Sequence, residues 1–239
     1  MPRFFVPSVD GDSITVTGQD ASHIRRSLRM AVGEELTVCD GKNTECVCTI
    51  REFAGEDVIL SVVSRAPSAA EPTCAVTLYQ GLPKADKMEW IIQKAVELGA
   101  VRIVPVQMAR SVAVINEKAA KKAARWQKIA DEAAGQSGRG ILPVVEEPIS
   151  FAAAAKRLAA ENTVVCYECG GVPFASLASR DTTAVSLVIG PEGGIDRREI
   201  ETLQQNGASI ATLGKRILRC ETAPVAALSV LMAVTGNME

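Results

Sequence analysis

Two glycine-bearing segments in the second half of the chain have the composition of ligand-binding loops. Residues 186–196 (SLVIGPEGGID) run from an apolar stretch through three glycines and a proline to Asp196. In an open α/β sheet, ligands bind beyond the carboxyl ends of the strands, where glycine lets the backbone approach a ligand closely. The segment lacks both the Walker motif and the G-x-G-x-x-G spacing, and Glu192 would repel a phosphate. A phosphate cradle is therefore weakly supported, and a tight turn between strand and helix stays the alternative.

The second segment, residues 213–223 (LGKRILRCETA), places charged and apolar side chains together between a predicted strand and the last predicted helix. Arginine and glutamate side chains can stabilise an anion or move a proton. Leaving Ile217 and Leu218 exposed in a loop would be costly. These two residues therefore either line a pocket or simply cover the end of the sheet.

The cysteines and the single histidine give little support for a metal site. Of the seven cysteines, Cys166 and Cys169 have the C-x-x-C spacing, but no second such pair follows, and His23 is far away in sequence. We therefore expect no bound metal. Cys46 and Cys48 alternate within a predicted strand, and we expect their thiols on opposite faces, unable to bind one ion together. An odd number of cysteines also argues against a disulfide scaffold.

The first 65 residues are mainly short β-branched runs separated by glycine and Asp/Asn turns. These runs predict strands at residues 13–17, 35–39, 46–50 and 57–63. One helix interrupts them, with Asp20 or Ser22 as its cap and Ile24, Leu28 and Met30 on its apolar side. A closed or partly closed barrel is the economical architecture, because it removes exposed strand edges.

After a proline-containing linker at residues 66–73, strands and helices alternate. Strands that are apolar throughout indicate a parallel sheet covered on both faces. We predict strands at 74–80, 101–106, 163–167, 184–189 and 209–213. We predict helices at 85–98, 117–134, 150–160, 196–205 and 222–234, with Ser150 and Asp196 as caps.

Composition and charge exclude some classes of protein. The 239 residues are 47% apolar and 23% charged, which is typical of a globular protein and excludes general disorder. No apolar run approaches the ~18 residues of a membrane helix, and residues 1–7 are too interrupted for a secretion signal, so we expect a cytoplasmic protein. The net charge is −2, but residues 84–139 carry 11 basic and 6 acidic side chains. A polyanion could bind there, although a solvated helix face explains the run Lys118, Lys121, Lys122, Arg125 and Lys128 better.

The two loops and four further stretches resemble the RsmE family, bacterial 16S rRNA (uracil-N3)-methyltransferases of the SPOUT superfamily. The matching stretches are residues 189–194, 213–223, 23–30, 87–99, 110–112 and 126–139. They follow the family order and span nearly the whole chain. Two positions depart from the family pattern, since Cys220 replaces a more usual threonine and Gly135 a more usual acidic residue.

The resemblance implies an α/β fold in two domains. A PUA-like, RNA-binding β-barrel would occupy residues 1–70. A SPOUT methyltransferase domain, a mostly parallel sheet with helices on both faces and a deep trefoil knot, would occupy residues 74–239. It also implies S-adenosylmethionine as methyl donor, a homodimer, and a uridine in the decoding region of 16S rRNA as target. The assembled small ribosomal subunit would present that uridine in a single shape.

The chemistry implied by the resemblance suggests candidate roles for residues of this sequence. Arg219 and Arg216 would stabilise the uracil anion, and Glu221 or Glu192 would orient the donor or relay the proton. The cofactor would contact Glu168, Ile189, Gly190, Glu192, Gly193, Gly194, Leu213, Gly214, Ile217, Leu218 and Thr222. The RNA would contact Arg3, His23, Arg26, Arg29, Lys42, Arg110 and Arg139, for each of which surface solubility is the alternative role.

Two other functions are compatible with the sequence. One is a non-catalytic RNA-binding or ribosome-assembly module, which the intact donor loops argue against. The other is an enzyme of the same superfamily that methylates a ribose 2′-hydroxyl instead of a base.

Overall fold

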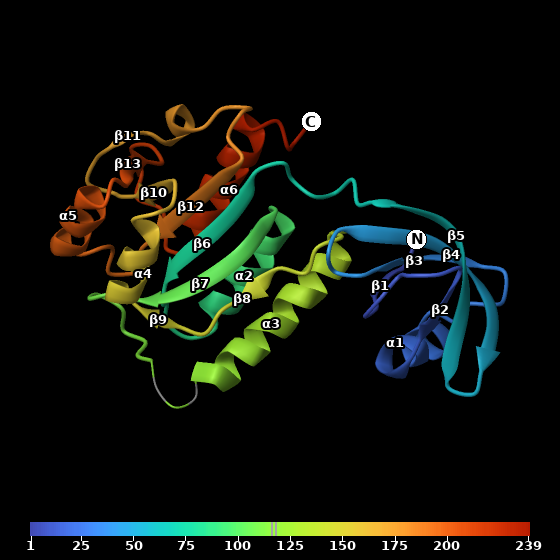
Figure 1. Ribbon diagram of the computed structural model, residues 1–239. Coiled ribbons are helices and arrows are strands. Elements are labelled where there is room, and N and C mark those ends of the chain that lie inside the picture. The colour runs from blue at the N-terminus through green and yellow to red at the C-terminus, as the bar shows by residue number, and fades with distance from the viewer. Residues whose placement is uncertain (116, 118) are drawn as a thin grey trace. The chain divides into compact units, whose positions relative to one another are not determined.

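The chain folds into two compact units, each with its own sheet (Figure 1). The computed structural model describes residues 1–115, 117 and 119–239. Residues 1–71 and 134–142 form the first unit, and residues 72–133 and 143–239 form the second. The chain first passes from one unit to the other between Glu71 and Pro72, which lies inside the expected linker at 66–73. Residues 134–142 were expected in the second domain, and the structure groups them with the first.

The first unit is a five-stranded sheet in the order β1-β3-β4-β5-β2. Its strands are β1 (Arg3–Phe5), β2 (Ser13–Val16), β3 (Glu35–Cys39), β4 (Thr44–Ala54) and β5 (Asp57–Pro67). Only the β1–β3 pair is parallel, and the other pairs are antiparallel. Strand pairing leaves β1 and β2 as the two edges of the sheet. The four expected strands are present, whereas the three-residue strand β1 was not predicted.

One apolar core fills the first unit and includes residues from the sheet and the short helical segment. This segment comprises α1 (Gly18–Ser22) and a π-helical turn at His23–Ser27. Ile24 is buried as expected, but Leu28 is 41% exposed. The predicted cap was wrong, because the helix starts after Thr17, not after Asp20 or Ser22.

The two strand thiols Cys46 and Cys48 are both fully buried in this same core. The expectation that they face opposite sides was wrong. Side chains two positions apart on a strand share one face, because the pleat repeats every two residues.

Residues 134–142 join the first unit through Glu71. The Glu71 carboxylate accepts hydrogen bonds from the backbone N–H groups of Gly140 and Ile141, at 2.9 and 3.0 Å. It also forms an ion pair with Arg139 at 2.7 Å, with both side chains almost completely buried. No local sequence pattern indicated these contacts, which join residues 68 to 70 positions apart.

The second unit is built on an eight-stranded sheet whose pairings are all parallel. The main path runs β11-β13-β10-β12-β6-β7-β8, and β9 pairs with β7. The strands are β6 (Ala75–Gly81), β7 (Ala100–Gln107), β8 (Val144–Val145), β9 (Ile149–Ser150), β10 (Thr163–Cys166), β11 (Val172–Pro173), β12 (Ala184–Ile189) and β13 (Ser209–Thr212). Strand order does not determine how one loop threads through another, so the trefoil knot stays a prediction.

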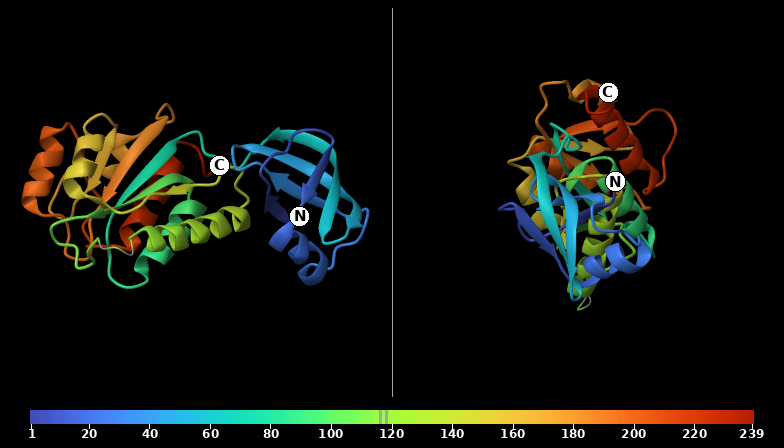
Figure 2. Two further views of the ribbon diagram at one scale, coloured as in Figure 1. Left: turned by 60° about the horizontal axis from the view of Figure 1, so that its bottom comes forward. Right: turned by 90° about the vertical axis from the view of Figure 1, so that its right-hand side faces the viewer.

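Helices cover both faces of this sheet (Figures 1 and 2). The helices are α2 (Lys87–Glu97), α3 (Ala119–Gln136), α4 (Phe151–Leu158), α5 (Arg197–Gln205), α6 (Thr222–Val234) and a 3-10 turn at Phe174–Leu177. Residues of α4 and α5 share one core with alternate residues of β6, β7, β10 and β12. On the other face, α2 and α6 contact each other. The parallel sheet with helices on both faces is therefore confirmed.

Both predicted helix caps in this unit are confirmed. The Ser150 hydroxyl accepts a hydrogen bond from the Ala153 N–H, and Asp196 forms a capping box with Glu199. Helix α2 begins two residues later than expected, because Ala85 adopts a positive φ of 51°.

The basic run on α3 is solvent-exposed at Lys121, Lys122, Arg125 and Lys128, and Arg125 pairs with Glu89 on α2. Lys118 lies outside the described residues. Within the described part of the chain, no helix combines the length and the apolarity needed to cross a bilayer.

Candidate functional site

Three loops meet at one edge of the parallel sheet. Strands β13, β10 and β12 are neighbours in the sheet, and they end at Thr212, Cys166 and Ile189. Because parallel strands point the same way, the segments that follow these three residues start at the same edge. The two loops singled out in the sequence and the start of the loop after β10 are thus brought together.

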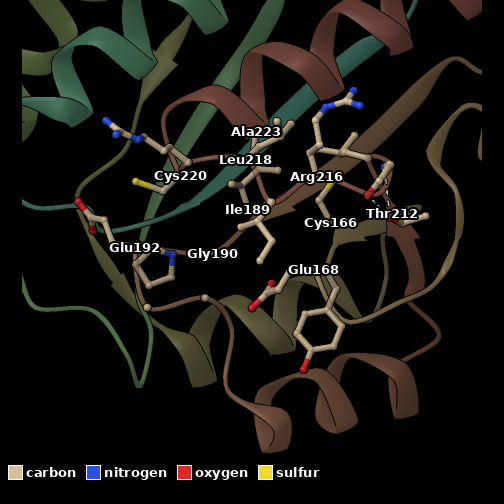
Figure 3. A pocket seen from close by; sticks show the side chains of 18 of the residues that line it. Cys166, Glu168, Ile189, Gly190, Glu192, Thr212, Arg216, Leu218, Cys220 and Ala223 are labelled. Atoms are coloured by element: carbon tan, nitrogen blue, oxygen red, sulfur yellow. Dashed lines mark hydrogen bonds between the residues drawn. The ribbon is translucent and has the colours of Figure 1, made fainter.

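These loops line a pocket of about 490 Å³, which is within the range for small-molecule and cofactor sites. Figure 3 shows Ile189 and Glu168 facing the same space, with Leu218 beside them. Twelve predicted site residues line the pocket: Glu168, Ile189, Gly190, Glu192, Gly193, Gly194, Leu213, Gly214, Arg216, Ile217, Leu218 and Arg219. Ile217 and Leu218 both border the pocket, but Ile217 is 82% exposed, so the expectation that it would not be left exposed was wrong.

Two predicted residues, Thr222 and Glu221, lie outside the lining. Thr222 is the first residue of α6, and its backbone N–H is hydrogen-bonded to the Arg219 carbonyl at 2.8 Å. Thr222 is exposed at the helix start.

The glycines of the loop after β12 are required by close packing. A Cβ atom at Gly194 would lie 2.5 Å from Oε1 of Glu168, whose exposed side chain would have to turn aside, and the φ of +72° at Gly194 itself favours glycine. A Cβ at Gly190 would lie 2.8 Å from Cγ1 of Ile195, and one at Gly193 would lie 2.9 Å from Cβ of Arg110. Larger side chains would therefore push the loop away from its neighbours.

Lys87, at the start of α2, binds carboxylates from two of the loops. Its Nζ lies 3.2 Å from Glu192 and 3.0 Å from Glu221. The Glu192 carboxylate also accepts hydrogen bonds from the Lys84 backbone N–H at 3.1 and 3.3 Å. Hydrogen bonds from Lys87 to Glu221 and Glu192 raise the pKa of Lys87, which therefore stays charged at neutral pH.

Both carboxylates are correspondingly weak bases. Desolvation opposes ionisation of Glu192, but hydrogen bonds from backbone N–H groups and from Lys87 outweigh it and lower the pKa. The pKa of Glu221 is also lowered, since hydrogen bonds from Cys220, its own backbone and Lys87 outweigh desolvation. A carboxylate with a lowered pKa does not readily accept a proton at neutral pH.

The remaining charged side chains of the pocket are open to a ligand. Arg216, Arg219, Lys215 and Glu168 are all exposed. Among the described residues, none of these four side chains has a hydrogen bond or an ion pair. The pocket thus combines apolar walls with one carboxylate, two guanidinium groups and one ammonium group that are not occupied within the protein.

The pocket thiols are unreactive. Burial raises the pKa of Cys166 to about 12, and burial together with the hydrogen bond to Glu221 raises that of Cys220 to about 12. Both thiols remain protonated at neutral pH, so neither is an activated nucleophile. Across the described residues, no group of three His, Cys, Asp or Glu side chains is arranged to hold a metal ion.

The seven residues expected to contact RNA fall into two groups. His23, Arg26, Arg29, Lys42 and Arg110 are exposed. His23 packs edge-on against Phe4, Arg26 pairs with Glu56, and Arg110 pairs with Asp196 near the pocket.

Arg3 and Arg139 form the second group, and the structure assigns them to internal contacts. Arg139 is only 2% exposed and paired with Glu71. Arg3 Nη1 donates to Cys39 Sγ at 2.8 Å, to Glu45 at 2.9 Å and to the Arg139 carbonyl at 3.3 Å. The expectation that Arg139 lies at the surface to meet a phosphate was therefore wrong, because its guanidinium neutralises a buried carboxylate.

Sequence reasoning missed eight lining residues: Lys87, Cys166, Tyr167, Pro191, Thr212, Lys215, Cys220 and Ala223. Cys166 and Thr212 end parallel strands, and Tyr167 follows directly, so the strand-end rule could have found these three. Lys87 carried no such signal, because its contacts are 105 and 134 positions away in the chain.

Family models for two RNA methyltransferase domains match the chain. One is described as an RNA methyltransferase domain and matches residues 70–232. The other is described as an RNA methyltransferase PUA domain and matches residues 16–62.

Individual relatives match over nearly the full length. Ribosomal RNA small subunit methyltransferase E of Bacillus subtilis is 36% identical over 97% of this chain and 96% of its own length. The protein of the same name from Synechocystis is 33% identical over 93% of this chain and 73% of its own. The crystal structure of the Neisseria gonorrhoeae protein of that name, bound to S-adenosyl methionine, is similar with a TM-score of 0.87 and 28% identity. The alignment covers 98% of this chain and 97% of that one.

Proposed function

Because this chain belongs to the ribosomal RNA small subunit methyltransferase E family, we propose that it methylates N3 of one uridine in the decoding region of 16S rRNA. It is an S-adenosylmethionine-dependent methyltransferase with an N-terminal PUA domain. The observation that carries the proposed chemistry is the pocket itself. Three strand-end loops enclose apolar walls, beside which two arginines have no partner among the described residues.

The residues of the pocket fit the donor. Ile189, Leu213 and Leu218 provide apolar walls for an adenine ring, and the glycine backbone offers hydrogen-bonding groups beside them. S-adenosylmethionine supplies, when bound, an electrophilic methyl group on a positively charged sulfur. Glu168 carries the opposite charge, and its side chain has no partner among the described residues.

The two arginines suit a uracil anion. N3 of uracil is an imide nitrogen that is protonated at neutral pH, and it must lose its proton before or during methylation. A guanidinium close to the uracil carbonyls stabilises the negative charge that then develops. Arg219 and Arg216 supply such groups at the pocket.

Of the two roles suggested for Glu192 and Glu221, orienting the donor or relaying the proton, the lowered pKa values argue against the relay. Their lowered pKa values and their contacts with Lys87 make them structural anions of the site. We therefore propose that the uracil proton goes to another acceptor, with solvent as the simplest choice.

The RNA and the second subunit complete the proposal. Phosphates of the assembled small ribosomal subunit would meet the exposed cations on the two units: His23, Arg26, Arg29 and Lys42 on the first, and Arg110 on the second. We propose that the protein acts inside the cell as a homodimer, with residues 1–70 as the RNA-binding domain and 74–239 as the catalytic domain.

Nucleoside analysis of ribosomal RNA tests the function directly. We expect 16S rRNA from a deletion strain to lack one N3-methyluridine, which returns when the gene is restored. Mass mapping would place that nucleoside in the decoding region. A missing 2′-O-methyl nucleoside would instead support methylation of the ribose. If no modification changes and calorimetry shows no binding of S-adenosylmethionine, the non-catalytic RNA-binding alternative would hold.

A further inference from the structure

Lys87 contacts two of the loops that line the pocket, and these loops are far apart in the sequence. Glu192 belongs to the loop after β12, and Glu221 directly precedes α6. Both carboxylates contact the same ammonium group, at 3.2 and 3.0 Å. Lys87 itself comes from α2, so three elements meet at one nitrogen on the pocket wall. Figure 3 shows Glu192 and Cys220, the neighbour of Glu221, on the same side of the pocket.

Further hydrogen bonds hold the two carboxylates that contact Lys87. The Lys84 backbone N–H fixes the Glu192 carboxylate from the loop that leads into α2. On the other side, the Cys220 thiol donates to the Glu221 carboxylate at 3.2 Å. Cys220 lines the pocket and is only 6% exposed. A substitution at Lys87 would therefore alter the position of a pocket wall, both through Cys220 and through the loop after β12.

The positive charge of Lys87 offsets the repulsion between the carboxylates of Glu192 and Glu221. Both carboxylates lie about 3 Å from one nitrogen, so they are at most about 6 Å apart. Without the ammonium, two like charges at this distance would repel each other and drive the two loops apart. The side chains of Lys87, Glu192 and Glu221 are 35%, 25% and 20% exposed, so water screens this repulsion only in part.

We propose that Lys87 is a positioning residue, an ammonium clasp that holds the loop after β12 and the loop before α6 in the one arrangement that forms the donor pocket. The inference builds on the proposed function, because it assigns the clasped pocket to S-adenosylmethionine. It gives Glu192 and Glu221 their role as the two anions that the clasp requires.

Amide hydrogen exchange of the ligand-free protein tests the clasp without any ligand. In Lys87→Met we expect exchange at residues 190–194 and 214–223 to be at least fivefold faster than in the wild type. These segments contain the protected N–H groups of Gly194, Thr222 and Ala223. Lys94→Met is the matched control, since Lys94 lies on the same helix and pairs with Glu97 at 2.8 Å, away from the pocket lining. It should leave both segments unchanged.

Binding of S-adenosylhomocysteine provides the second measurement. This donor product lacks the sulfonium charge, so its affinity reports loop order without the attraction of a sulfonium to the two carboxylates. We expect at least tenfold weaker binding in Lys87→Met, and binding within threefold of the wild type in Lys87→Arg and Lys94→Met. In the double variant Lys87→Met/Glu221→Gln, removal of the repulsion should restore at least half of the lost affinity on a logarithmic scale.

The proposed role of Lys87 and the proposed function are tested by different outcomes. Unchanged exchange of both loops in Lys87→Met overturns the clasp, whatever the protein binds. Faster exchange with unchanged affinity also overturns it, because the loops would then not control the pocket. If the wild type binds neither S-adenosylmethionine nor its product, the proposed function fails, and the exchange experiment still decides whether Lys87 holds the loops. Thermal unfolding of each variant identifies any loss caused by general misfolding.

Discussion

Arg139 in the first unit and Arg219 in the second carry the same guanidinium group in opposite surroundings. Arg139 is 2% exposed, and its charge is matched by the almost completely buried Glu71. Arg219 is exposed at the pocket, with no hydrogen bond or ion pair to its guanidinium among the described residues. In sequence, both residues looked like surface cations available to RNA or to a developing anion.

The difference shows how burial divides charged residues by role. A buried charge costs several kcal/mol to desolvate, so it is kept only with a partner, and removing one partner is strongly destabilising. An exposed charge beside a cavity costs little to keep and stays available to a ligand. We therefore expect Arg139 to control stability and Arg219 to control chemistry.

Replacement of Arg139 by alanine should have the largest effect on stability. The Glu71 carboxylate would lose its ion pair while remaining buried, which typically costs about 3–5 kcal/mol. Urea unfolding of the full chain measures this loss. Arg26→Ala is the control, because the Arg26–Glu56 pair is 73% and 81% exposed and should contribute less than about 1 kcal/mol. Equal effects of the two substitutions would contradict the structural role of Arg139.

Replacement of Arg219 by alanine should lower methyl transfer by about 100-fold, since it removes a group that stabilises the developing anion. Donor affinity should change less than threefold, and the unfolding free energy less than about 0.5 kcal/mol. Single-turnover methylation of small subunits and calorimetry measure the two effects separately. Arg197, at the start of α5, has a side chain that is 86% exposed, and Arg197→Ala should change neither methyl transfer nor donor affinity. Unchanged turnover would remove Arg219 from the mechanism.

Replacement of Gly194 by alanine should weaken donor binding by about tenfold, because the new Cβ would push the Glu168 carboxylate away from its place at the pocket. The strained φ should also cost about 1–2 kcal/mol of stability. Gly207→Ala shares that backbone cost, as Gly207 has a φ of +90° with open space around it. Calorimetry should therefore show normal donor binding in Gly207→Ala. Similar binding by both variants would show that the loop tolerates a side chain at Gly194.

The smallest expected effect is the contribution of Glu221 to the pH dependence of the unfolding free energy. Its folded pKa lies below the ordinary value of 4.5, so ionised Glu221 stabilises the fold at higher pH, and this contribution is lost as the pH falls through the folded pKa. For this partly exposed pair we expect it to stay below about 1 kcal/mol. The difference in unfolding free energy between wild type and Glu221→Gln should be constant above pH 6 and shrink below pH 4.5. A difference that grows on acidification would mean that the folded pKa is raised instead.

Local patterns predicted most of the second unit. The β-branched strand at Ala184–Ile189 and the helix at Thr222–Val234 have the bounds expected from sequence, and the caps Ser150 and Asp196 are the residues expected. Such elements depend on neighbours a few positions away, which the sequence shows directly. The short strands β1, β8, β9 and β11 were missed, because two or three residues carry no periodic signal and pair only when distant partners are in place.

The two glycine loops, the apolar strands before them and the family resemblance could be predicted from contiguous residues, because each depends only on neighbours in the chain. Which charges are structural became known only from the folded arrangement. Arg139 meets Glu71 across 68 positions, and Lys87 meets Glu221 across 134. Whether an arginine is buried with a partner or left at a pocket depends on what the fold places beside it, because the cost of a charge is set by the water and opposite charge around it.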